Sequence, residues 1–206
     1  LQGSAEITIG NVVGSNILNI LIILGISALV YPLVVAKTTI WADIPVMIGA
    51  TILLFALGYD GTVSRVDAII LLIAFAAYLA FLFYLTKKNQ AAEKLLSSSD
   101  IEKEDVSKPE KLFSLPKAIL LTVVGLALII LGSNFCVDSA TAIARMVGLS
   151  ERFIGLTIVA LGTSLPELFT SVSASIKKNS DIAIGNIVGS NIFNILFIVG
   201  LSGLII

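Results

Sequence analysis

The sequence predicts an all-α membrane protein with six transmembrane helices, built from two related halves. The 206-residue chain is 57% hydrophobic and only 13% charged, whereas about a quarter of the residues in a soluble domain are charged. Its mean hydropathy is +1.03. One segment also occurs twice, as ITIGNVVGSNILNILIILGISAL at residues 7–29 and as IAIGNIVGSNIFNILFIVGLSGL at residues 182–204. An internal repeat of strongly apolar segments is typical of membrane transporters made of two related halves.

Six apolar stretches are long enough to cross a bilayer, which takes about 20 residues. Backbone polar groups in lipid must be satisfied within the segment, so these stretches are predicted to be helices. In chain order, the expected spans are residues 7–34, 40–58, 66–86, 115–147, 152–176 and 180–206. The fourth is too long to stand upright. It is expected to tilt, or to end in an interfacial stretch near Ala144.

The third and fourth spans are separated by a polar insertion at residues 87–114, which is charged, rich in serine and poor in aromatic residues. This composition predicts a mobile linker with room for one short helix. The chain then divides into first-half membrane helices at 1–86, the linker, and second-half membrane helices at 115–206. A regulatory partner could bind the linker, but its composition favours a plain solvated connection.

The basic residues predict the orientation of the spans. With six spans, ten of the 13 lysines and arginines fall on the side of the linker, and Arg65, Arg145 and Arg152 fall on the other. Positive charge is enriched in cytoplasmic loops, so the linker is predicted to be cytoplasmic, in a multi-pass protein of the plasma membrane. Both chain ends then face outward. The two repeat copies cross the membrane in opposite directions.

The strongest candidate site lies just before the second repeat copy, in the stretch GLTIVALGTSLPE that ends at Glu167. Pro166 lacks an amide hydrogen and clashes with the preceding turn, so a broken helix is expected around residues 162–167. A break at this depth frees backbone carbonyls and survives only around a cavity or within protein. Carbonyls, hydroxyls and one carboxylate form a hard oxygen site that suits Na⁺ or Ca²⁺. A simple proline kink is disfavoured, because an unpaired carboxylate in the membrane costs several kcal/mol.

Polar residues recur every four positions in each repeat copy and therefore share one helix face. These residues are Asn11, Ser15 and Asn19 in the first copy, and Asn186, Ser190 and Asn194 in the second. Ser15, Asn19, Ser190 and Asn194 are favoured as site residues, because they lie deeper along each helix. For Asn11, Asn16, Asn186 and Asn191, hydrogen bonding between helices is an equally good interpretation. The glycines at 10, 14, 185 and 189 form GxxxG patterns, which let helix backbones approach closely.

Several functions are excluded or disfavoured. The chain has no histidine, which excludes imidazole catalysis and His-based zinc sites. Ser164 lies in GTSLP, but the nucleophile elbow needs glycine where Pro166 stands, so we expect no enzyme. A net charge of −1 with no basic patch gives no sign of a nucleic-acid partner. Cys136 rules out an internal disulfide framework and is expected to be an inert, buried thiol.

The motifs resemble those of a known family. GLTIVALGTSLPE followed by GNIVGSNIFN is similar to the second α-repeat of the sodium/calcium and cation/calcium exchanger superfamily, and GNVVGSNILN is similar to the latter part of the first. The resemblance is to prokaryotic members and covers nearly all of the chain outside the linker. It implies an inverted-repeat fold of ten helices, of which the six spans here match helices three to eight. It also implies ion binding by Thr163, Ser164, Glu167 and the Ala160 carbonyl, completed by Ser15, Asn19, Ser190 and Asn194.

The chain departs from this family pattern in two ways. Some relatives carry aspartate where Asn194 stands, which leaves the number of coupled ions and any potassium dependence open. The first α-repeat should also begin with its own GTSLPE segment, and the chain starts at Leu1, after the place where that segment would end. We therefore expect a fragment that lacks the first two and last two helices. A cloning scar at Leu1–Ser4 would not restore the missing segment.

The resemblance implies a parent protein that exports Ca²⁺ in exchange for Na⁺ by alternating access, with membrane lipid and the two transported ions as its partners. An alternative is Ca²⁺/H⁺ exchange, in which Glu167 takes up a proton during the cycle. A third reading is that this chain is a non-transporting structural core of the membrane, which could form a homodimer. The fragment by itself is expected to be inactive.

Overall fold

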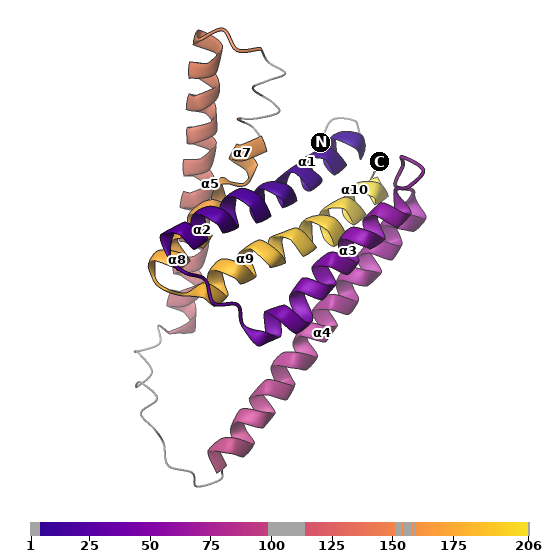
Figure 1. Cartoon of the computed structure of the whole chain (residues 1–206), viewed down its shortest axis with the longest axis vertical. Helices are drawn as coiled ribbons and strands as arrows, with labels where there is room; N and C mark the ends of the chain where they lie inside the picture. Colours follow the sequence, from indigo (N-terminus) through magenta and orange to yellow (C-terminus); the bar gives the residue numbers. More distant parts are fainter. Residues whose placement is uncertain (1–4, 99–113, 151–153, 155–157, 159, 206) are drawn as a thin grey trace.

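A computed structural model of the chain describes residues 5–98, 114–150, 154, 158 and 160–205. These residues fold into helices joined by short connections, which confirms the all-α class (Figure 1). The elements in chain order are α1 (Ala5–Leu18), the π-helical turn η1 (Asn19–Ile23), α2 (Leu24–Val30), η2 (Thr39–Asp43), α3 (Ile44–Leu57), α4 (Arg65–Ser98), α5 (Leu115–Met146), α7 (Ala160–Thr163), α8 (Leu165–Ile176), α9 (Ser180–Phe193), η4 (Asn194–Val199) and α10 (Gly200–Ile205).

Among the described residues, five continuous helical segments are long and apolar enough to cross a membrane. They are Ile9–Val30, Thr39–Leu57, Arg65–Gln90, Leu115–Met146 and Ser180–Ile205. The sixth expected span, at 152–176, is not continuous, because Ser164 interrupts the helix between α7 and α8. The sequence predicts this break around residues 162–167, and the structure confirms it. The earlier part of that span at residues 151–153, 155–157 and 159 lies outside the described residues.

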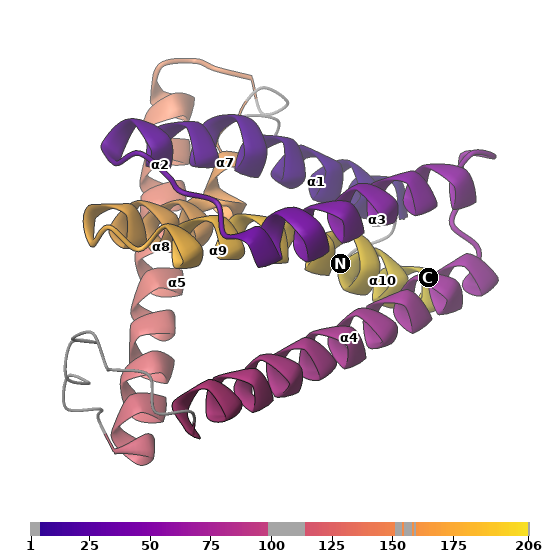
Figure 2. The same cartoon turned by 60° about the horizontal axis from the view of Figure 1, so that its bottom comes forward.

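The two repeat copies lie side by side and run in opposite directions (Figures 1 and 2). The first copy forms α1, η1 and α2, and the second forms α9, η4 and α10. The start of the first copy packs on the end of the second, since α1 contacts η4 and α10 whereas α2 contacts α9. The π-helical turns also begin at equivalent positions, Asn19 and Asn194. The inverted arrangement expected from the sequence is therefore confirmed.

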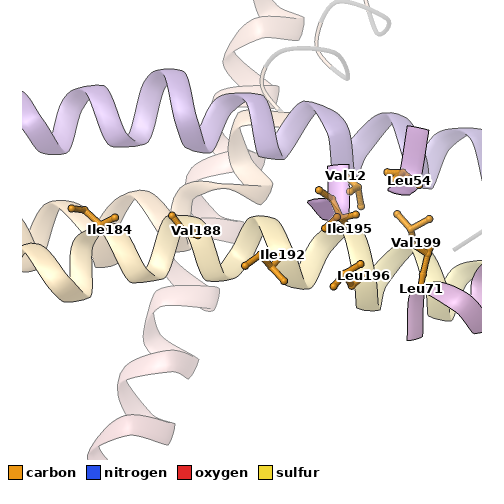
Figure 3. Close-up of a cluster of buried hydrophobic side chains, with 10 residues drawn as sticks. Val12, Leu54, Leu71, Ile184, Val188, Ile192, Ile195, Leu196 and Val199 are labelled. Atoms are coloured by element: carbon orange, nitrogen blue, oxygen red, sulfur yellow. The ribbon is translucent and has the colours of Figure 1, made fainter. Parts of the chain in front are cut away.

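The second repeat copy forms the centre of the packing. Half of its span is buried, against 6% of the α5 span. Its aliphatic side chains meet those of α1, α3 and α4 in one buried cluster (Figure 3). That cluster consists of Val12, Ala50, Leu54, Leu71, Ile184, Val188, Ile192, Ile195, Leu196 and Val199. A Cβ at Gly200 would lie only 3.2 Å from the Ala68 carbonyl oxygen, so a small residue lets α10 pack closely on α4, as is common in membranes.

The long helices α4 and α5 differ in part from the sequence expectation. α4 continues to Ser98, so the first part of the polar segment 87–114 extends the membrane helix, and residues 99–113 lie outside the described residues. α5 is unbroken over 32 residues, through Ala144, and crosses the repeat helices steeply (Figures 1 and 2). Most of its surface is exposed, and this includes Cys136, whose expected burial is wrong. A residue in an apolar span can lie on a helix face that no other helix covers, so its place in the span does not predict its burial.

Two groups of connections lie at opposite ends of the repeat helices (Figure 1). Beyond α2, the backbone N–H of Val34 donates to Ser180 Oγ at the start of α9, over 3.2 Å. Lys178 Nζ lies 5.8 Å from the centre of the Tyr31 ring at the same end. The two chain ends and the α3–α4 turn lie at the other end (Figure 1). These two groups fit the expected alternation, but the connection after α5 lies away from the chain ends (Figure 2). The alternation of all loops and the cytoplasmic assignment of the lysine-rich end stay predictions.

Candidate functional site

The helix break at Ser164 places three of the expected site residues at one turn. α7 ends at Thr163, Ser164 has left the α-helical conformation with a ψ of 2°, and α8 begins at Leu165. Pro166 lies in the first turn of α8, where a missing N–H needs no acceptor. The Ser164 N–H donates to the Leu161 carbonyl over 3.0 Å, whereas an uninterrupted α-helix would direct it to Ala160. The last turn of α7 is therefore tighter than an α-helical turn.

Glu167 projects from the first turn of α8 into a pocket between α8 and α9. The pocket has a volume of about 370 Å³ and is lined by Glu167, Gly185, Asn186, Gly189, Ser190, Phe193 and Asn194. Three of the expected site residues, Glu167, Ser190 and Asn194, therefore meet at one cavity. The Oε2 atom of Glu167 is buried and has no hydrogen-bond partner among the described residues. A buried carboxylate oxygen without a donor is costly, and a bound cation would offset that cost.

A hydrogen-bond relay holds α8 against α9 beside this carboxylate. Asn186 Nδ2 donates to the Glu167 backbone carbonyl over 3.2 Å and to Ser171 Oγ over 3.0 Å. Ser171 Oγ donates in turn to the Ala183 carbonyl over 3.2 Å. Asn186 therefore joins the two helices and also lines the pocket. A contact between helices and a place at the candidate site are thus compatible for this residue. Ser171 was missed, although its place one turn after Glu167 on the same helix face could have indicated it.

Four asparagines join the two repeat copies at their crossing. Asn16 Nδ2 donates to the Asn191 carbonyl over 3.2 Å, and Asn191 Nδ2 donates to the Asn16 carbonyl over 3.4 Å. Asn19 Nδ2 donates to Asn191 Oδ1 over 2.9 Å, and Asn194 Nδ2 donates to Asn16 Oδ1 over 3.1 Å. Asn16 and Asn191 are 175 residues apart, the offset between the repeat copies. For both, the interpretation as contacts between helices is confirmed.

The remaining expected site residues do not line this pocket. Ser15 and Asn19 are buried on the first repeat copy, and η1, which begins with Asn19, packs against α8. Asn19 Oδ1 is a second buried oxygen for which the described residues supply no partner. Ser164 is buried at the break, whereas Thr163 is exposed at the end of α7. The backbone of Ala160 opens α7, one turn before Ser164.

The GxxxG glycines play a different part from the one expected. A Cβ added at Gly10, Gly14, Gly185 or Gly189 would meet no atom of the described structure within 4 Å. Within the described part of the chain, these glycines therefore provide no close helix contact. Gly185 and Gly189 line the pocket instead, because a residue without a side chain leaves room beside Glu167, Ser190 and Asn194.

The side-chain atoms around the pocket are of the kind that binds hard cations. In the described parts of the chain, no three His, Cys, Asp or Glu side chains gather closely enough to hold a metal ion. The pocket instead combines one carboxylate with hydroxyl and amide oxygens. Such oxygens suit Na⁺ and Ca²⁺ and do not select soft metals.

The chain is similar to a known family and to several of its members. The sequence pattern of the family described as sodium/calcium exchanger protein matches residues 1–84 and 117–206. The chain is 38% identical to the inner membrane protein YrbG of Escherichia coli, over 100% of this chain and 62% of that protein. It is 34% identical to the sodium/calcium exchanger MaX1 of Methanosarcina acetivorans, over 99% of this chain and 66% of the relative.

A solved structure of the sodium-calcium exchanger NCX_Mj, soaked with zero Na⁺ and Ca²⁺, has the same fold. It superposes with a TM-score of 0.74 at 32% identity, and the match covers 97% of this chain and 60% of that one. The chain thus spans about six-tenths of the length of YrbG and of NCX_Mj.

Proposed function

Since the chain belongs to the sodium/calcium exchanger protein family, we propose that it supplies most of the membrane core of a secondary antiporter that exports Ca²⁺ in exchange for Na⁺. The observation that carries the proposal is the buried, unpartnered Glu167 carboxylate oxygen in a pocket shared with Ser190 and Asn194. A buried ionisable group in a membrane marks an ion pathway by default.

The proposed ion ligands come from both repeat copies and from the broken helix. Glu167 supplies the charge, and Ser190 and Asn194 supply oxygens in the same pocket. The further proposed ligands are the Ala160 carbonyl, Thr163, Ser164, Ser15 and Asn19. Broken helices at the interface of inverted repeats are the usual place for coupling ions in secondary transporters.

The proposed coupling is competition for one set of oxygens. The same ligands hold either Ca²⁺ or Na⁺, so that one ion is released on one side of the membrane before the other binds. A ligand changes a conformational equilibrium only through its different affinity for the two states. Rocking of one repeat against the other would expose the site alternately to each side, with the linker in the cytoplasm.

The test is ion flux through the full-length protein reconstituted in liposomes. With Na⁺ inside and radioactive Ca²⁺ outside, we expect Ca²⁺ uptake that stops when the Na⁺ gradient is removed. Uptake driven by a pH gradient alone would instead support Ca²⁺/H⁺ exchange, in which Glu167 carries the proton. If neither gradient drives uptake by correctly folded protein, both versions of the proposal are wrong.

A further inference from the structure

The four asparagines at the crossing of the repeats form a network whose amide orientations follow from the backbone. Asn16 and Asn191 each donate Nδ2 to the backbone carbonyl of the other. A carbonyl oxygen can only accept a hydrogen bond. The backbone therefore decides which end of each of these two side chains is the amide nitrogen and which is the oxygen.

The orientation of Asn16 and Asn191 then sets that of Asn19 and Asn194. The oxygens of the first pair are directed away from the carbonyls and accept bonds from the second pair, over 2.9 Å at Asn19 and 3.1 Å at Asn194. Asn19 and Asn194 must therefore turn their NH₂ groups toward the crossing. Their Oδ1 atoms are left on the other side of the amide.

Both oxygens belong to residues that are proposed as ion ligands. Asn194 lines the Glu167 pocket, and Asn19 Oδ1 is buried with no partner among the described residues. The orientation decides the sign of the interaction, because an amide oxygen attracts a cation whereas an amide NH₂ group repels it. A free carboxamide could turn either way.

We propose that Asn16 and Asn191 are positioning residues for ion binding, which hold Asn194 and Asn19 with their oxygens toward the ion. This inference rests on the proposed function, since it assigns a role within the same site. Each positioning residue lies on the opposite repeat from the ligand that it orients. The arrangement therefore couples ion affinity to correct docking of the two repeats. Metal sites often depend in this way on groups that orient the ligands without touching the metal.

The experiment compares Asn191→Leu with Asn191→Asp in the full-length protein, using Na⁺-driven Ca²⁺ uptake into liposomes. Leucine removes the oxygen that accepts from Asn19, so we expect the KM for Ca²⁺ to rise about 10-fold or more, with a smaller change in kcat. Aspartate keeps an accepting oxygen, so the KM is not expected to rise. Thr122→Val removes a hydroxyl that bonds within α5, to the Ala118 carbonyl, and is expected to leave the KM unchanged.

A measurement without transport complements the flux assay. Ca²⁺ should raise the unfolding temperature of the purified wild-type protein, and Asn191→Leu should need about 10-fold more Ca²⁺ for the same rise. The pair Asn16→Leu and Asn16→Asp repeats the test for Asn194. A residue that only joins the helices would lower the amount of folded protein without changing the KM.

Each outcome decides the inference. A leucine variant with the wild-type KM, or equal increases in KM for leucine and aspartate, would overturn it. If the leucine variants do not fold, the aspartate variants decide alone, because a 10-fold higher KM despite the kept acceptor contradicts the proposed role. Absence of both Ca²⁺ uptake and a Ca²⁺-dependent unfolding shift in the wild-type protein would instead refute the proposed function itself.

Discussion

At the scale of single residues, the pocket between α8 and α9 combines one charge with several neutral oxygens. Glu167 supplies the carboxylate, and one of its oxygens is buried without a partner among the described residues. Ser190 and Asn194 line the same pocket and add a hydroxyl and an amide. Neutral oxygens solvate a cation but do not balance its charge, so binding should depend mainly on Glu167.

Glu167→Gln is expected to abolish Ca²⁺ uptake while leaving membrane insertion intact. The substitution removes the charge and keeps the shape, so the loss would be electrostatic rather than steric. Asp138→Asn is the matched control, because it also converts a carboxylate in a membrane helix to an amide, at an exposed position of α5. Flux in liposomes measures both. Wild-type uptake by Glu167→Gln would remove Glu167 from the site.

At the scale of elements, the position of the broken helix depends on how closely α7 approaches α5. Gly162 faces the Val137 side chain of α5, and there is no room for a Cβ between them. This contact precedes Thr163 and Ser164 directly in the chain. Displacing α7 would therefore move Thr163 and Ser164, together with the oxygen atoms that these residues are proposed to offer to an ion.

Gly162→Ala is expected to lower both the unfolding temperature and Ca²⁺ uptake, because the added methyl group overlaps Val137. Overpacking of this kind typically costs about 1–3 kcal/mol. The double variant Gly162→Ala/Val137→Ala should recover much of both properties by restoring the space. Gly125→Ala on α5, where a Cβ meets no atom within 4 Å, is the control. If the double variant is no better than Gly162→Ala, the contact with Val137 is not the cause.

The antiparallel pairing of α1 with α9 predicts a specific cross-link. In a background with Cys136→Ala, cysteines at Ser15 and Ser190 should react with a short bifunctional reagent, because they flank the Asn16–Asn191 contact. Cysteines at Ser15 and Ser180 should not, since Ser180 lies ten residues, or about 15 Å, further along the helix. Mass shifts after proteolysis measure both pairs. Equal reaction of the two pairs would argue against the observed register.

At the scale of the whole molecule, the structure places two groups of connections at opposite ends of the repeat helices, and their direction across the membrane is a prediction. The connection after α2 and the α8–α9 turn share one end through the Val34–Ser180 contact. The two chain ends and the α3–α4 turn share the other (Figure 1). The lysine distribution predicts that the first end is cytoplasmic.

Single cysteines at Lys94 and Lys178 are expected to be labelled from the cytoplasmic side, and one at Arg145 from the outside. The assay is labelling of intact cells and of inverted vesicles with a reagent that does not cross membranes, again in the Cys136→Ala background. Lys94 and Lys178 on opposite sides would contradict the proposed topology.

The 206-residue chain by itself is expected to insert into membranes, bind Ca²⁺ weakly and not exchange ions. It brings the Glu167 carboxylate to the pocket, and two charges are needed to neutralise Ca²⁺. The α5 span is only 6% buried within the chain, so self-association, most simply as a symmetric dimer, would cover apolar surface. Purified chain in liposomes with a Na⁺ gradient tests this. Robust Na⁺-dependent Ca²⁺ uptake would show that it is sufficient for exchange.

The sequence alone determined the membrane class, five of the six expected spans, the inverted repeat and the break near Pro166. These features depend on the local composition of the chain and on neighbouring residues. The helix break, for example, follows from a proline that has no N–H to donate. The residues Ser164, Glu167, Ser190 and Asn194 could be selected for the same reason, since polar groups in apolar helices are costly wherever they lie.

Tertiary structure decided which polar residues share a pocket and which join the helices. Asn191 and Asn194 lie three residues apart on one helix, yet Asn191 bonds the opposite repeat through both ends of its amide while Asn194 lines the Glu167 pocket. The GxxxG glycines, which the sequence indicated as packing sites, have no described residue within contact of an added Cβ, and Cys136 is exposed. Helical periodicity places residues on a face, but only the docking of distant helices decides what that face meets.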